Sequence, residues 1–162
     1  DLDKKRGSEA ILKRMGYQVA PVTIDNSDYL YALRYQQALT KGDAAQAARI
    51  AADYIRYMDE VTAFFEKRSV EVVGREIAQI LLIHANELNR AAMPDLLAMF
   101  KKRGYAIVPL EKALADPAYL SPDTFAGEKG ISWIHRWGVT KGMPFLLEPD
   151  PPKWILDEPR TP

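Results

Sequence analysis

The most regular pattern of apolar residues predicts a long amphipathic helix that begins just after Gly42. Asp43 and Gln46 stand at the start of this segment with the spacing of a capping box. Apolar residues then recur at helical spacing along one face, at Ala47, Ile50, Tyr54, Met58, Val61 and Phe65. A stripe of this width is typical of a helix that packs on a core, so we expect these side chains to be buried.

Three shorter runs, residues 17–24, 77–84 and 105–108, have the composition of strands. The first run is β-rich, although Pro21 can donate no ladder hydrogen bond. The second is almost continuously apolar and ends at His84, which is typical of a parallel strand covered on both faces. Asp25 and Asp28 follow the first run, so we expect them at the carboxyl end of a strand, where α/β folds place ligands.

The other segments alternate with these runs as helices. We expect helices over residues 8–15 with Ser8 as a cap, over 94–103 with Pro94 near its start, and over 110–115 and 131–140. The final segment, residues 144–162, holds six prolines and predicts an extended tail. Strands that alternate with helices predict an α/β fold with parallel strands, in residues 1–142, followed by the proline-rich tail of residues 143–162.

Composition narrows the classes of function. The 162 residues suffice for one domain, and the 22 basic side chains match the 22 acidic ones, which disfavours a general nucleic-acid binder. The chain has no Cys, which excludes disulfides, thiolate catalysis and Cys-based zinc sites. No run approaches the roughly 20 apolar residues that span a bilayer, so we expect no membrane span. The chain begins with Asp1, so a processed product and part of a longer protein both stay open.

The candidate chemistry rests on the two histidines of the chain. His135 lies between Trp133 and Trp137 in a predicted helix, which favours a packing or hydrogen-bonding role. His84 ends a predicted strand, where a structural and a catalytic role are both open. The sequence contains no HExxH motif, Gly-rich phosphate loop or nucleophile elbow. A metal site would need His84 together with carboxylates, a weak set of ligands for zinc.

Three motifs in order, over about residues 8–115, resemble the polysaccharide deacetylase family, the NodB-homology domain of carbohydrate esterase family 4. Residues 16–19 (Gly-Tyr-Gln-Val) and 25–29 (Asp-Asn-Ser-Asp-Tyr) are similar to its fourth motif. Residues 80–84 (Ile-Leu-Leu-Ile-His) are similar to its fifth, and 104–110 to the strand that usually ends the domain. The resemblance implies the C-terminal part of a seven- or eight-stranded (β/α) barrel, which contributes about three parallel strands with outer helices.

The same resemblance implies roles for individual residues. The family hydrolyses N-acetyl or O-acetyl groups on sugars with a zinc-type divalent metal, and its fifth-motif histidine, here His84, is the general acid. Asp25 or Asp28 would contact His84 and favour its protonated form. Leu82 would line the pocket for the acetyl methyl group. Two further candidates for substrate binding are Asn86 and Tyr29, which stands where the family has Trp.

The chain also departs from the family. The first three motifs, which supply the metal ligands and the catalytic base, are absent, so no metal ligand is assigned to this chain. The implied partners are a carbohydrate substrate and either the missing N-terminal half or a second copy of the chain, and the family favours an extracytoplasmic location. A non-catalytic remnant or carbohydrate-binding protein on the same fold is the alternative, and an unrelated small α/β domain is a third.

Overall fold

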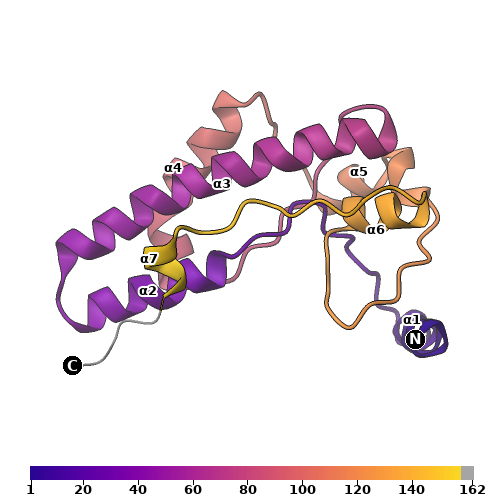
Figure 1. Ribbon diagram of the computed structural model, residues 1–162, viewed down its shortest axis with the longest axis horizontal. Coiled ribbons are helices and arrows are strands. Elements are labelled where there is room, and N and C mark those ends of the chain that lie inside the picture. The colour runs from indigo at the N-terminus through magenta and orange to yellow at the C-terminus, as the bar shows by residue number, and fades with distance from the viewer. Residues whose placement is uncertain (158–162) are drawn as a thin grey trace. The chain divides into compact units, whose positions relative to one another are not determined.

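The protein is helical in the computed structural model, which describes residues 1–157 (Figure 1). Its elements are α1 (Leu2–Arg14), α2 (Asp28–Thr40), α3 (Ala44–Val73), α4 (Glu87–Lys102), α5 (Leu110–Leu114), the 3₁₀ helix η1 (Pro117–Leu120), α6 (Trp133–Thr140) and α7 (Lys153–Leu156). Helices make up 59% of the structure and strand 1%. No helix in the described part of the chain is long and apolar enough to cross a membrane.

The prediction of a (β/α) barrel with parallel strands is therefore wrong. Residues 17–24, 77–84 and 105–108 form no sheet, and the described chain holds a single parallel bridge between Ile24 and Leu81. Around that bridge the backbone N–H groups of Thr23 and Ile24 both donate to the carbonyl of Ile80, at 2.9 and 3.0 Å. Two of the three predicted strands thus lie side by side at one point without extending into a ladder.

The reason lies in the partners that the backbone finds. Along residues 77–84, side chains take hydrogen bonds that a neighbouring strand would otherwise make. Ile80 N–H donates to the hydroxyl of Thr23 at 2.7 Å, and the Ala78 carbonyl accepts from Tyr119 at 2.5 Å. Ala78 N–H donates to the carboxylate of Asp116 at 3.2 Å. The apolar, β-branched residues favour an extended backbone here. The side chains of Thr23, Asp116 and Tyr119 occupy the backbone groups that a regular sheet would need.

Several helix predictions are confirmed, with corrected bounds. The stripe of α3 is buried, from Ala47 at 5% exposed to Tyr54 at 0%, and Asp43 accepts the N–H of Gln46 at 2.9 Å. Pro94 does not open its helix, because α4 already begins at Glu87. Ser8 is no cap either, since its hydroxyl donates to the Lys4 carbonyl within α1.

The predicted tail is extended apart from the short helix α7, and its end, residues 158–162, lies outside the described residues. Helix α2 was not predicted at all.

The chain divides into two compact units, each built from segments distant in sequence. Unit 1 comprises Asp1–Asp25, Phe65–Leu81 and Val108–Leu147, and unit 2 comprises Asn26–Phe64, Leu82–Ile107 and the chain from Glu148. Helix α3 contributes its first part to unit 2 and its last part to unit 1.

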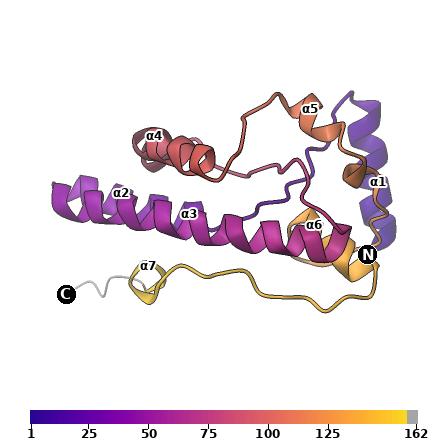
Figure 2. The same ribbon diagram turned by 90° about the horizontal axis from the view of Figure 1, so that it is seen from above.

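In unit 2, α2 packs against α4 and α7, which lie on opposite sides of it (Figure 2), and it forms a helical hairpin with the first part of α3 (Figure 1). The tyrosine rings of this hairpin make its core, with Tyr31 centred 5.5 Å from Tyr54 and 5.2 Å from Tyr57. Arg34 of α2 holds α7 by donating to the carbonyl of Ile155 at 2.8 Å. Full burial of rings such as these contributes about 1.5–3 kcal/mol each, which stabilises the helices that position the site.

Candidate functional site

A hydrogen-bonded network in unit 2 joins His84, Asp28, Asn89 and Tyr54. The carboxylate of Asp28, 0% exposed, accepts the backbone N–H of His84 at 2.8 Å and faces His84 Nδ1 at 2.7 Å. Asn89 Nδ2 donates to the same carboxylate at 2.8 Å and to the His84 carbonyl at 2.8 Å. The hydroxyl of Tyr54 donates to Asn89 Oδ1 at 2.7 Å. Every polar group of this cluster that is buried therefore has a partner.

Local structure brings these residues together. Asn26 accepts the N–H of Asp28 at 2.9 Å and donates to the Leu82 carbonyl at 2.6 Å, which ties the start of α2 to the segment before His84. Asp28 is the first residue of α2, where the positive end of the helix dipole favours a carboxylate. Just after His84, Asn86 caps α4 by accepting the N–H of Asn89 at 2.8 Å. Two helix N-termini thus converge on the histidine.

The His84 side chain is 53% exposed, although its carboxylate partner is buried. It lines an open hollow of about 810 Å³, within the roughly 300–1,000 Å³ typical of small-molecule sites. The other residues of this hollow are Gln36, Ile83, Ala85, Asn86, Glu87, Asn89, Arg90 and Met93. Glu87 and Arg90 pair with each other at 2.6 Å, so the lining, most of whose surface is apolar, is close to neutral in charge.

The geometry determines which nitrogen of His84 is available. The Asp28 carboxylate accepts hydrogen bonds from the His84 backbone N–H and from Asn89 Nδ2, and its third contact is with Nδ1 of the His84 ring. An ionised carboxylate can only accept, so Nδ1 carries a proton and Nε2 is the nitrogen that exchanges protons with a ligand. A ring held in this way can act as an acid or a base at one defined atom.

The hydroxyl groups of Tyr54 and Tyr57, on the adjacent helix α3, stay protonated. Burial, and after it the charge of Asp28, raises the pKa of Tyr54 far above its ordinary value. Burial also raises the pKa of Tyr57, against the hydrogen bond that its hydroxyl accepts from Ser27 N–H at 2.9 Å. Both hydroxyls therefore remain neutral at physiological pH and keep their roles in the hydrogen-bond network.

The structure distinguishes among the residues singled out from the sequence. Asp28 contacts His84, and Asn86 lies in the lining of the hollow as well as at the helix cap. Leu82 is 37% and Tyr29 57% exposed, and neither belongs to the lining that the described residues form. The roles of all these residues in catalysis or substrate binding stay predictions.

The divalent metal that the resemblance implies does not fit the residues at hand. Among residues 1–157, no group of three or more His, Cys, Asp or Glu side chains is placed to hold an ion. Near His84 the carboxylate of Asp28 already accepts from three N–H groups, and that of Glu87 is paired with Arg90.

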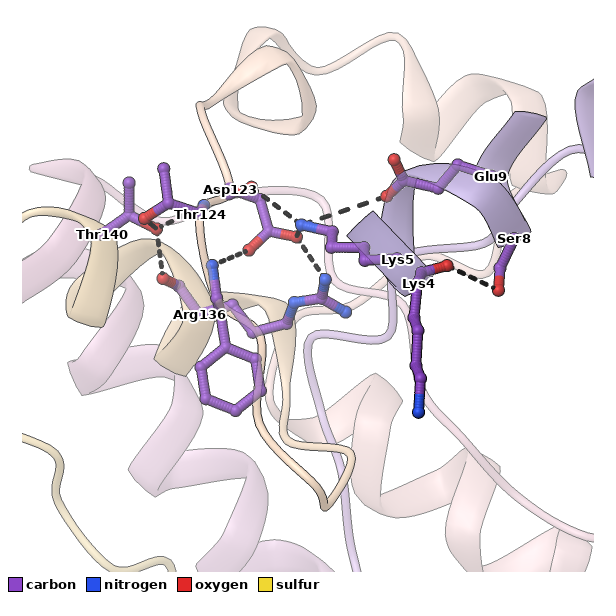
Figure 3. Close-up of polar contacts among 9 residues, drawn as sticks. Lys4, Lys5, Ser8, Glu9, Asp123, Thr124, Arg136 and Thr140 are labelled. Carbon is purple, nitrogen blue, oxygen red and sulfur yellow. Dashed lines mark hydrogen bonds and ion pairs between the residues drawn. The ribbon is translucent and has the colours of Figure 1, made fainter. Parts of the chain in front are cut away.

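A second polar cluster lies in unit 1 and has a different character (Figure 3). Asp123 accepts from Lys5 Nζ of α1 at 2.7 Å and pairs with Arg136 of α6, so two cations share one carboxylate. Burial opposes its ionisation, but the hydrogen bonds from Lys5 and Arg136 outweigh that effect and lower the pKa of Asp123. Arg136 also lies 3.9 Å above the ring of Trp133. This cluster fastens α1 to α6 and leaves no titratable side chain poised for chemistry.

His135, the other histidine, is confirmed as a packing residue. It is 1% exposed and lies between the rings of Phe65, centred 5.3 Å away, and Phe145, at 4.7 Å. Burial, and then the positive charge of Arg68, lowers the pKa of His135 to about 4. The ring is therefore neutral and structural at physiological pH.

Sequence reasoning missed Asn89 and Tyr54. Tyr54 was assigned only to the core stripe of α3, and Asn89 lay before the helix predicted over residues 94–103. A signal was present, because Asn86 and Asn89 have the spacing of a helix cap and its N3 partner just after a histidine. The pairing with Tyr54 spans 35 residues and has no local signature.

Comparison of the chain with protein-family models, with curated proteins and with solved structures found no match.

Proposed function

We propose that this chain supplies the proton-transfer part of a carbohydrate deacetylase site, with His84 as the general acid. The observation that carries the proposal is the pair of a half-exposed imidazole and a fully buried carboxylate, 2.7 Å apart. A carboxylate that accepts from Nδ1 holds the ring in place and leaves Nε2 for a ligand, the arrangement a proton donor needs. The motifs around His84 and Asp28 that resemble the deacetylase family lead to the same role.

The reaction step assigned to His84 is protonation of the sugar nitrogen as it leaves the acetyl group. Water adds to the acetyl carbonyl, and the tetrahedral intermediate then breaks its C–N bond. Nε2–H of His84 donates its proton to the leaving nitrogen, which departs as a neutral amine while acetate forms. Asp28 holds the ring at Nδ1 throughout. The residues described here do not supply the activation of the water, which the resemblance assigns to family motifs absent from this chain.

The hollow beside His84 suits an uncharged polyhydroxylated ligand. Gln36 and Asn86 offer amide donors and acceptors for hydroxyl groups, while Ile83 and Met93 offer apolar surface for a sugar face or an acetyl methyl. The pairing of Glu87 with Arg90 leaves no net charge to attract an ionic substrate. An N-acetylated sugar therefore matches the hollow better than a phosphorylated or acidic one.

A partner that completes the site is part of the proposal. Tyr17 is 63% and Ile107 72% exposed, although both belong to apolar extended segments. We expect them to be covered by a segment that carries the metal ligands or by a second copy of the chain.

The test is acetate release from N-acetylated chito-oligosaccharides by a polypeptide that joins this chain to the metal-ligand motifs. His84→Gln should lower turnover by roughly 10²–10⁴-fold, the usual contribution of general acid–base catalysis, and leave the bound metal unchanged. Unaltered turnover in His84→Gln would refute the role of the histidine. Tight binding of the oligosaccharide with no acetate release by the wild type would favour the carbohydrate-binding alternative.

A further inference from the structure

The strongest unassigned feature of the site is the pair of buried residues behind Asp28. Asn89 is 3% and Tyr54 0% exposed, and neither reaches the ligand side of His84 through its hydrogen bonds. A neutral amide and a phenol buried at this point cost desolvation that an apolar pair would avoid. Their hydrogen bonds therefore need an explanation beyond packing.

The amide of Asn89 is used completely. Its two N–H groups go to Asp28 Oδ2 and to the His84 carbonyl, both at 2.8 Å, and its oxygen accepts from Tyr54 at 2.7 Å. The Tyr54 hydroxyl can donate only to an oxygen here, so it sets which end of the amide faces the carboxylate. Burial raises the pKa of Tyr54, which keeps that donor protonated.

The same amide holds both partners of the dyad at once. One N–H fixes the Asp28 carboxylate, and the other fixes the backbone of His84, so the carboxylate and the imidazole are positioned relative to each other through a single rigid group. Rotation of Asp28 about its side chain would break contacts to Asn89 and to the His84 N–H together. Networks with every member satisfied restrict such rotation.

We infer that Asn89 and Tyr54 are positioning residues that hold Asp28 against Nδ1 of His84 and so fix the protonation pattern of the imidazole. This inference rests on the proposed function of His84 and adds the residues that set its geometry. Asn89 bonds directly to the carboxylate and has the larger effect. Tyr54 acts one bond further away, through the orientation of the amide.

The tautomer of His84 gives a readout that stability alone does not move. A neutral histidine free in water favours the proton on Nε2, whereas the Asp28 contact requires it on Nδ1. Long-range ¹H–¹⁵N spectra of the full chain, recorded where the ring is neutral, distinguish the two forms. The wild type should show Nδ1–H almost exclusively. Asn89→Ala should shift His84 to a mixture in which Nε2–H predominates, and Tyr54→Phe should shift it part of the way.

The matched control is Ala92→Gly, which weakens the same helix α4 at a buried position without touching the network. It should leave the His84 tautomer as in the wild type. A pure Nδ1–H form in folded Asn89→Ala would overturn the inference and leave the proposed function standing. If Asn89→Ala does not fold, an unshifted tautomer in Tyr54→Phe overturns it instead. Nε2–H in the wild type itself would remove the dyad, and the proposed function with it.

Discussion

Each of the two units contains one histidine and a hydrogen-bonded cluster around a carboxylate with little exposed surface, but histidine and carboxylate are in contact in only one of these clusters. In unit 2, Asp28 holds His84 by Nδ1 and leaves the ring 53% exposed. In unit 1, Asp123 binds two cations, and His135 is 1% exposed among aromatic rings. A buried carboxylate therefore marks a chemical site only where its partner reaches solvent. Where both partners are enclosed, the same residue types serve stability.

The largest expected effect concerns Asp28. Asp28→Ala removes the acceptor of three hydrogen bonds and leaves the N–H groups of His84 and Asn89 without it. Leaving a buried donor without its acceptor costs about 1–3 kcal/mol for each group. Urea denaturation should show that loss in Asp28→Ala and a loss well under half as large in Asp3→Ala, which removes a carboxylate that is 91% exposed. Equal losses in the two variants would contradict the assignment of Asp28 as the structural anchor.

The burial of His135 in unit 1 should make the stability of the protein depend on pH. Its folded-state pKa of about 4 lies below the ordinary 6.5, so the unfolded chain binds the proton more tightly. The stability that the neutral ring contributes is complete above about pH 6.5 and is lost as the pH falls toward 4. The gap between 6.5 and about 4 corresponds to about 3 kcal/mol at roughly 1.36 kcal/mol per pH unit.

The measurement is the free energy of unfolding from pH 7 to pH 4 for the wild type and for His135→Phe. The variant should lose less stability over this range than the wild type, because carboxylates titrate in both proteins and only the wild type has His135. Parallel curves for the two proteins would contradict the burial of a neutral histidine.

A smaller effect is expected at the carboxylate of unit 1. Asp123→Asn keeps the side-chain shape but leaves Lys5 and Arg136 facing a neutral amide (Figure 3). The loss should be about 2 kcal/mol, as expected when a hydrogen-bonded charge with little exposed surface is removed, and 1 M salt should reduce the difference between variant and wild type. Chemical denaturation at low and high salt tests this, and an increase in stability on mutation would contradict it.

The success of sequence reasoning differed between the helices and the extended runs. The stripe of α3 and the cap at its start were predicted correctly, because helical burial and capping depend on residues within a few positions. Residues 77–84 have the composition of a buried strand, but side chains as distant as Asp116 and Tyr119 satisfy their backbone. Such partners leave no trace in a local pattern, so the barrel was predicted where the structure has two extended segments and one bridge.

The candidate site was predictable only where local sequence patterns mark its residues. His84 and the choice between Asp25 and Asp28 came from motif spacing, and the start of α2 at Asp28 resolved the choice. Asn89 and Tyr54 could not be found, because their contact depends on how α3 and α4 pack. The packing of His135 was predicted from the tryptophans on either side of it, whereas the role of His84 stays a prediction.

The central claim is that Asp28 acts through His84 in proton transfer, and a double-mutant cycle on turnover tests it most directly. Acetate release from N-acetylated chito-oligosaccharides is measured for His84→Gln, Asp28→Asn and the double variant, in the polypeptide that also carries the metal-ligand motifs. Residues that act as one unit are not additive. The double variant should therefore be no slower than His84→Gln alone, within about a factor of two to three. Losses that multiply would show that Asp28 and His84 act independently and would contradict the account.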